Sequence, residues 1–172
     1  AVDHIVKARR IYILGVRSSS SLAAFLDHSL RMIFDNVRLV QTASGAEVFE
    51  QMLGVGDGDA VIAISFPRYS KRIIKATEYA HKSGADVICL TDSVESPLAA
   101  SADQLLVAQS DMVSFVDSLT APMSLINAMI AYIAKKKNVE VIDTLERLEA
   151  IWHEYNVYTN GNSASGETKN DR

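Results

Sequence analysis

Hydroxyl side chains follow directly after the first apolar run of the chain. Ile11 to Leu14 is short and carries no charge, as expected of a strand buried on both faces of a parallel sheet. Gly15 permits a sharp turn, and residues 18–21 are four consecutive serines. The apolar residues that follow recur at helical spacing, so a helix begins inside the serine run. Helix N-terminal N–H groups and serine hydroxyls donate to anions, and the stretch therefore predicts a phosphate cradle.

Two later strand ends carry hydroxyls as well. Ser65 ends the apolar run that starts at Asp59, and Ser70 is placed to cap the helix that follows. Thr91 ends a further apolar run and precedes Asp92. Because parallel strands end at one edge of a sheet, where such folds bind ligands, these hydroxyls are predicted to share a site with the serine run.

Each of these residues also has a purely structural interpretation. A helix cap needs one serine, whereas Ser18, Ser19 and Ser20 exceed that need, so we favour anion binding. Taken alone, Ser65 would be a strand end and Ser70 a helix cap. Because they are expected beside the serine run of the first loop, we favour a ligand-binding role for them as well. Thr91 with Asp92 can also form a plain turn.

Strand and helix patterns alternate along the whole chain. This predicts a three-layer α/β/α sandwich, doubly wound and flavodoxin-like, with a five-stranded parallel sheet. Strands are expected at 11–14, 37–41, 59–65, 86–91 and 103–108, and helices at about 19–33, 45–53, 70–83, 114–137 and 145–155, with the end of a helix within 1–9. The glycine-rich stretch 54–58 is expected to be a surface turn.

Composition limits the classes of function. At 172 residues we expect one domain over 1–158 and a disordered, polar tail over 159–172. A net charge of −4 argues against nucleic-acid binding by this chain itself. No apolar run is long enough to span a membrane and no signal peptide opens the chain, so a cytoplasmic location is expected. Cys89 is expected to be a core residue. The histidines are scattered along the chain, so no metal site is predicted. No cofactor is expected.

The loops carry a family resemblance. The chain resembles the sugar isomerase (SIS) domain, most closely the C-terminal effector domain of RpiR-type bacterial transcription regulators. In this family the first loop has the sequence pattern Gly-x-Gly-x-Ser, and the second has the pattern Ser-x-Ser-Gly-x-Thr. Here they are Gly15-Val16-Arg17-Ser18-Ser19 and Ser65-Phe66-Pro67-Arg68-Tyr69-Ser70. Pro97-Leu98-Ala99 after Thr91 also matches.

The resemblance implies a phosphorylated sugar, or a derivative of one, as ligand. Ser19, Ser65 and Ser70 would hold the phosphate, with Ser18, Ser20 and Arg68 nearby and Thr91 at the sugar end. It further implies a homodimer or higher homo-oligomer. The apolar stripe of the long helix expected over 115–133 makes that helix a candidate interface. DNA would be bound only through an N-terminal helix-turn-helix domain absent from this chain.

This sequence departs from the family pattern in ways that bear on function. Arg17 and Arg68 replace loop glycines, and Arg72 stands where a glutamate is usual. The two loop arginines can bind the phosphate, point to solvent or fill the pocket, and the sequence leaves these alternatives open.

Two other functions compete with the sensor. A sugar-phosphate aldose–ketose isomerase needs a carboxylate or histidine over the sugar. The candidates for that base are Glu47, His81, Glu95, Asp111 and Asp117, of which Glu95 and Asp117 stay open. Because nothing marks either as a base, we expect binding without catalysis. The remaining alternative is a dimerisation module without ligand. The sequence does not identify the sugar, the operator or the sign of regulation.

Overall fold

A parallel sheet lies at the centre of the protein. The computed structural model describes residues 1–40, 44–111 and 117–158. Within these ranges the strand order is β2-β1-β3-β4-β5, the flavodoxin-like arrangement, which confirms the predicted fold class. The strands are β1 (Ile11–Gly15), β2 (Val37–Leu39), β3 (Ala60–Ile64), β4 (Asp86–Thr91) and β5 (Gln104–Val107).

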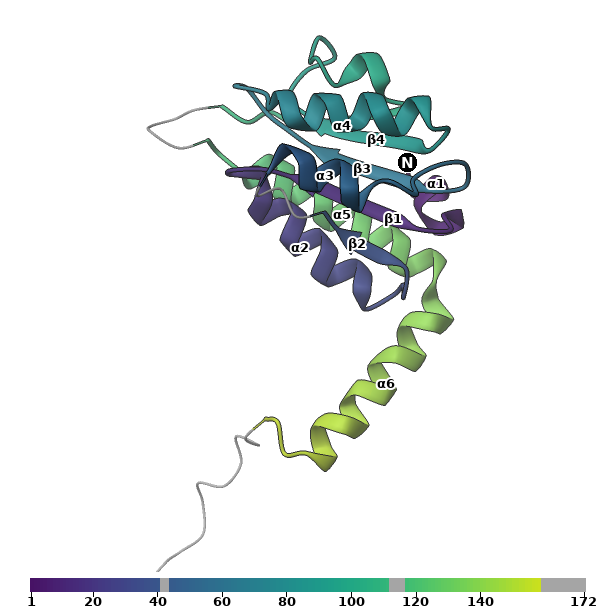
Figure 1. Cartoon of the computed structure of the whole chain (residues 1–172). Coiled ribbons are helices and arrows are strands. Elements are labelled where there is room, and N and C mark those ends of the chain that lie inside the picture. Colours follow the sequence, from purple (N-terminus) through teal and green to yellow (C-terminus); the bar gives the residue numbers. More distant parts are fainter. Residues whose placement is uncertain (41–43, 112–116, 159–172) are drawn as a thin grey trace, which may run out of the picture.

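Helices cover both faces of this sheet (Figure 1). One face packs against α1, α2 and α5, and the other against α3 and α4. The helices are α1 (Val2–Lys7), α2 (Ser19–Arg31), α3 (Gly45–Gln51), α4 (Lys71–Lys82), α5 (Thr120–Lys136) and α6 (Asn138–Glu154), with a short 3₁₀ helix η1 (Ala99–Ser101). None of them, within the described ranges, is long and apolar enough to cross a membrane.

The register of the central strands aligns the loops that follow them. Every residue of β1 and β3 is buried, which explains why both are apolar runs. Gly15 pairs with Ile64, and Ile64 pairs in turn with Leu90. The turns after β1, β3 and β4 therefore start next to one another, at the sheet edge on the left of Figure 1.

The long helix begins later than the sequence pattern predicted. The expected start at residue 114 lies outside the described residues, but 117–119 are not helical and α5 begins at Thr120. Pro122 accounts for this start, because proline lacks an N–H and is tolerated only in the first turn of a helix. The first helical bond is donated by the N–H of Met123 to the carbonyl of Leu119.

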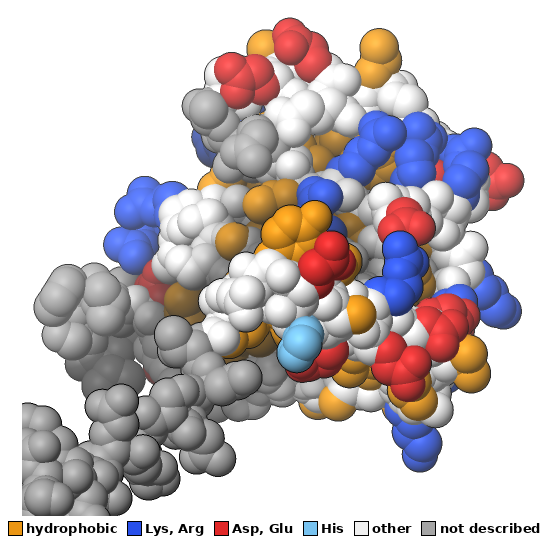
Figure 2. Space-filling view, turned by 90° about the horizontal axis from the view of Figure 1, so that it is seen from below, with side chains coloured by type: hydrophobic (Ala, Val, Ile, Leu, Met, Phe, Trp, Pro, Cys, Tyr) orange, Lys and Arg blue, Asp and Glu red, His pale blue; other side chains and the backbone are white. Residues whose placement is uncertain are grey.

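The last helix, α6, extends away from the sheet (Figure 1). Its amphipathic pattern was predicted correctly, yet none of its residues is buried. Figure 2 looks at the side on which α6 projects and shows hydrophobic side chains among acidic and basic ones. The predicted disordered tail 159–172 lies outside the described residues.

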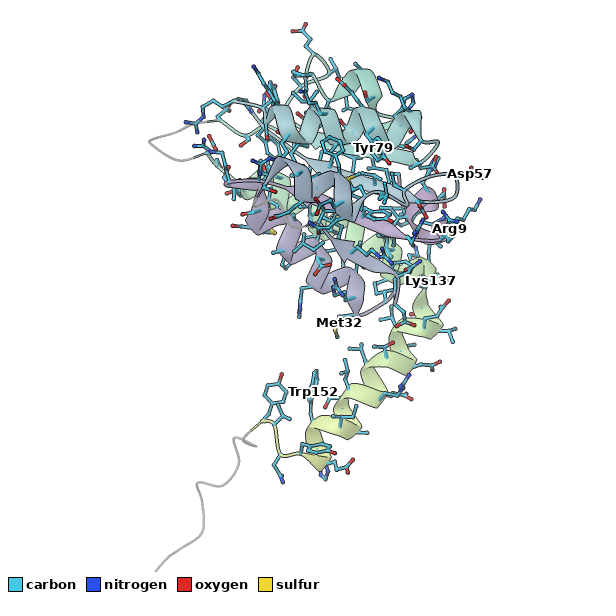
Figure 3. All side chains as sticks on the ribbon, viewed as in Figure 1. Arg9, Met32, Asp57, Tyr79, Lys137 and Trp152 are labelled. Atoms are coloured by element: carbon cyan, nitrogen blue, oxygen red, sulfur yellow. The ribbon has the colours of Figure 1, made fainter. Side chains whose placement is uncertain are left out.

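A buried ion cluster closes the opposite, amino-terminal edge of the sheet. The Asp59 carboxylate is inaccessible to solvent and accepts hydrogen bonds from Arg9 and Arg10. It also accepts from the backbone N–H of Gly56, within the predicted surface turn. Figure 3 shows Arg9 and Asp57 at this edge, far from the loops that follow the strands.

Candidate functional site

The first loop depends on the glycine that ends β1. A Cβ atom at Gly15 would lie 2.5 Å from the carbonyl oxygen of Ser19 and 2.9 Å from the Cβ of Ala23. Glycine therefore lets the first turn of α2 approach the strand end directly. The N–H groups of Ser19 and Ser20 donate to the carbonyls of Val16 and Arg17, which holds the serine run in a tight turn.

Both site loops contain an arginine in a backbone conformation that favours glycine. Arg17 has φ 57° and Arg68 has φ 66°. These are the positions at which the family pattern has glycine, so the loops keep the glycine conformation with a larger side chain. A left-handed conformation costs an ordinary residue about 1–2 kcal/mol, and such strain is concentrated at functional sites. Both side chains are exposed.

The second loop connects β3 to α4. Ser65 is 4% exposed, and its hydroxyl accepts a bond of 3.4 Å from the N–H of Ser70. Ser70 precedes α4, but its hydroxyl does not cap that helix. The predicted capping role is therefore not observed, and the hydroxyl of Ser70 has no partner among the described residues.

Five of the predicted ligand residues meet at one small pocket between these loops. Its volume is about 20 Å³, room for about one water molecule. It is lined by Val16, Arg17, Ser18, Ser19, Ser65, Phe66, Pro67, Arg68, Ser70 and Asp117. The hydroxyl of Ser19, like that of Ser70, makes no hydrogen bond to a described residue. The pocket therefore offers donors that a phosphate oxygen can accept from.

The other two predicted ligand residues lie outside this pocket. Ser20 is exposed, and its hydroxyl donates to the carbonyl of Arg17 at 2.6 Å. Thr91 is fully buried, and its hydroxyl contacts Ser96 at 2.9 Å and Asp92 at 3.2 Å. Tyr69 joins this group by donating to Asp92 at 2.7 Å. Burial, followed by this bond to a carboxylate, raises the pKa of Tyr69.

A carboxylate from outside the two loops completes the pocket. Asp117 lies three residues before α5 and is 14% exposed. One of its oxygens accepts a 3.0 Å hydrogen bond from the hydroxyl of Ser18, and the other lies 3.4 Å from a guanidinium nitrogen of Arg68. Among the described lining residues it is the only acid. The sequence placed Asp117 among candidate bases but gave no sign of these contacts.

The remaining candidate bases are not at the pocket. Glu47 forms a capping box with Ser44 at the start of α3. His81 lies in the last turn of α4 and contacts Asp103. Glu95 and Asp111 are exposed. Arg72, which replaces the family glutamate, is half-buried in α4 and does not line the pocket. Within the described residues, no cluster of three metal-ligating side chains occurs.

The family assignment follows from this fold and these loops. The model of the SIS domain matches residues 4–132, and the chain belongs to that family. A solved SIS domain of an RpiR transcription factor from Sphaerobacter thermophilus has 26% sequence identity and a TM-score of 0.81, covering 87% of this chain and 83% of that one. The resemblance to RpiR-type effector domains is thereby confirmed.

Further relatives are regulators or share the fold. An uncharacterised HTH-type transcriptional regulator of Caldanaerobacter subterraneus is 26% identical over 88% of this chain and 54% of its own length. The chain thus spans about half the length of the curated relatives it matches. The NanR protein of Vibrio vulnificus, solved with ManNAc-6P, has 19% identity and a TM-score of 0.76, covering 92% of this chain and 60% of that one. For two other solved structures with this fold, a sugar-phosphate isomerase function has been inferred.

Proposed function

We propose that this chain is the phosphosugar-sensing domain of a bacterial RpiR-type transcription regulator. The observation that carries the proposal is the convergence of Ser18, Ser19, Ser65, Arg68 and Ser70 on one pocket. The phosphate is bound between the N-termini of α2 and α4, where the helix ends favour an anion and the hydroxyls of Ser19 and Ser70 donate to it. NanR, which shares the fold, was solved with a phosphorylated sugar, and this supports the ligand class.

The sugar extends from the phosphate toward the end of β4. Tyr69 belongs to the second loop and bonds to Asp92, next to Thr91. A ligand that moves the second loop therefore also acts on the β4 end. Ser20 is the predicted ligand residue that the geometry favours least, because its hydroxyl is directed to its own loop.

Ligand binding controls DNA binding by a helix-turn-helix domain outside these 172 residues. The curated relatives are HTH-type transcriptional regulators of which this chain spans about half, and this supports such an architecture. In this architecture residues 1–158 form the effector domain of a cytoplasmic protein. Gel-shift titration of the full regulator with the sugar phosphate that binds this domain tests the coupling.

Binding occurs without isomerisation in this proposal. A proton transfer between sugar carbons needs a free carboxylate or histidine at the sugar. Asp117 is the acid at the pocket, and its contacts are with Ser18 and Arg68, which the proposal assigns to the phosphate and not to the sugar carbons. We expect no interconversion of aldose and ketose phosphates by the purified domain. Turnover that is lost in Asp117→Asn would instead establish the isomerase alternative.

The domain forms a homodimer through α6, with α5 adjoining. Apolar residues along α6 and directly after it recur at spacings of four and three: Val141, Leu145, Leu148 and Trp152 in the helix, and Tyr155 after its end. This is the pattern of a helix–helix seam. An isolated helix of this length is marginally stable in water, and a partner helix would stabilise it. Figure 3 shows Trp152 far from the sheet.

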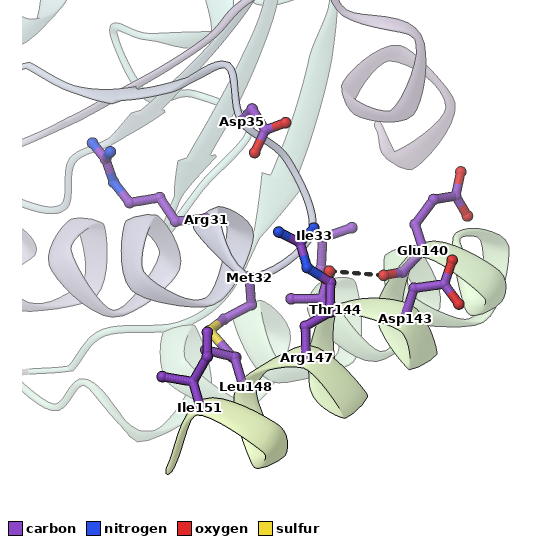
Figure 4. Close-up of a pocket in the computed structure, with 10 residues that line it drawn as sticks. All are labelled: Arg31, Met32, Ile33, Asp35, Glu140, Asp143, Thr144, Arg147, Leu148 and Ile151. Atoms are coloured by element: carbon purple, nitrogen blue, oxygen red, sulfur yellow. Dashed lines mark hydrogen bonds between the residues drawn. The ribbon is translucent and has the colours of Figure 1, made fainter. Parts of the chain in front are cut away.

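Beside this seam, α6 and the end of α2 form an open groove of about 430 Å³ (Figure 4). Within one chain, Met32 lies beside Leu148 and Ile151 in this groove, and Ile33 lies beside Thr144. Light scattering on Leu145→Glu, with exposed Glu146→Gln as control, tests the interface. We expect a monomer for the first variant and an unchanged dimer for the second, and a monomeric wild-type domain would contradict the proposal.

A further inference from the structure

The site already contains an anion supplied by the chain itself. The Asp117 carboxylate contacts one donor from each loop, the Ser18 hydroxyl at 3.0 Å and the Arg68 guanidinium at 3.4 Å. Both belong to the donors that the proposed function assigns to the phosphate. A carboxylate and a phosphate have the same requirement for such donors, so they compete for this position.

The small volume of the pocket also indicates that Asp117 and a phosphate group cannot occupy it together. A pocket of about 20 Å³ does not accommodate a phosphate group. Most of its walls are fixed, because Gly15 contacts α2 closely and the N–H of Ser65 is bonded to the carbonyl of Leu90. Arg68, whose side chain is 57% exposed, and Asp117, which lies outside any helix, are not held in this way.

The contact between these two side chains is suited to exchange. Charge-assisted hydrogen bonds in proteins are about 2.7–2.9 Å long, and the Arg68–Asp117 distance of 3.4 Å is longer. An ion pair with an exposed partner contributes little to stability. Breaking this ion pair therefore costs little by itself. The larger cost of displacing Asp117 is its shorter hydrogen bond from the Ser18 hydroxyl, because bonds to a charged group are the stronger ones. A phosphate at the same place gains both donors.

We propose that the Asp117 carboxylate occupies the phosphate position in the free protein and that a bound phosphate group displaces it. This inference rests on the proposed phosphate site. Asp117 then sets the affinity of the sensor, because each binding event must first release this internal anion. Because Asp117 lies three residues before α5, its release also moves the segment that enters this helix. Ligand binding can affect the rest of the domain through this movement.

The test compares the affinity of three proteins for inorganic phosphate, titrated with backbone amide chemical shifts as the readout. Asp117→Asn removes the charge and keeps the shape. Asp111→Asn is the matched control, because Asp111 is exposed and its carbonyl accepts from the N–H of Ser118, beside Asp117. We expect Asp117→Asn to bind phosphate about tenfold more tightly than wild type, a difference of about 1.4 kcal/mol. Asp111→Asn should match wild type.

The outcomes separate this inference from the function on which it rests. Phosphate binding by Asp117→Asn that is equal to or weaker than wild type overturns the displacement, as does an equal gain in Asp111→Asn. If neither wild type nor Asp117→Asn binds phosphate or any sugar phosphate, the phosphate site itself is wrong. Asp117→Ser serves the same comparison if the asparagine variant does not fold.

Discussion

The buried carboxylate of Asp59 provides a quantitative test of what holds this fold together. Its side chain is inaccessible to solvent and accepts from the Nε and Nη2 atoms of Arg9 at 3.0 and 3.2 Å and of Arg10 at 3.1 and 2.8 Å. The N–H of Gly56 adds a fifth bond at 3.0 Å. The cluster joins the start of β1 to the turn before β3, so it aligns the two central strands.

We expect Asp59→Asn to destabilise the domain by about 3 kcal/mol. Breaking a buried ion pair by removing one partner costs roughly 3–5 kcal/mol. The lower end applies here, because the Arg9 side chain is 60% exposed and Arg10 is 25% exposed, so both regain water. Urea denaturation followed by circular dichroism measures the change. Glu140→Gln, which removes the exposed contact to Lys137, should cost less than about 0.5 kcal/mol.

The same carboxylate predicts how stability depends on pH. Burial alone would raise the pKa of Asp59, but the hydrogen bonds from Arg10, Arg9 and Gly56 outweigh it and lower the pKa. A depressed pKa stabilises the folded state above the unfolded value of about 3.9 and loses that contribution as the pH falls below it. The stability gap between wild type and Asp59→Asn should therefore narrow below about pH 4. A variant as stable as wild type at pH 7, or a gap that widens in acid, would refute the reasoning.

Three further predictions concern single positions. Gly15→Ala places a Cβ atom 2.5 Å from the carbonyl oxygen of Ser19, and we expect a loss of about 1–3 kcal/mol in urea denaturation. Arg17→Val should cost about 1–3 kcal/mol because a β-branched residue resists φ 57°, whereas Arg17→Gly should stay within about 1 kcal/mol of wild type. Burial raises the pKa of the Cys89 thiol to about 12, so a thiol reagent at pH 8 should label it only after unfolding; rapid labelling of the native domain would contradict its burial.

The local features of this fold were predictable from sequence for a physical reason. Strands buried on both faces are mostly apolar, so β1 and β3 appear as uninterrupted apolar runs and β4 as an apolar run between Asp86 and Thr91. Alternation with helices then determines a parallel sheet, whose carboxyl ends share one edge. The meeting of Ser19 with Ser65 follows from this edge alone.

Contacts between distant segments were not predictable in this way. Ser18 and Asp117 are 99 residues apart, and Arg10 and Asp59 are 49 apart. No local periodicity encodes such pairs, because periodicity relates only residues that are close together in the chain. The amphipathic pattern of α6 likewise predicted a helix but not where it projects. An apolar stripe indicates that a face is covered, without saying by what.

A thermal-shift screen with a panel of sugar phosphates tests the central claim most directly. A ligand at a hundredfold excess over its dissociation constant stabilises the folded state by about 2.7 kcal/mol, which raises the melting temperature of a domain of this size by roughly 5–10 °C. Inorganic phosphate and free sugars are the ligand controls. Ser19→Ala should reduce the shift to about half or less, because a bond to a charged group contributes about 1.5–3 kcal/mol.

Ser21→Ala is the matched control, since Ser21 is exposed on the same helix and does not line the pocket. The account predicts a shift with one sugar phosphate that survives in Ser21→Ala and shrinks in Ser19→Ala. A folded domain that responds to no sugar phosphate, or a shift that Ser19→Ala leaves intact, would contradict it.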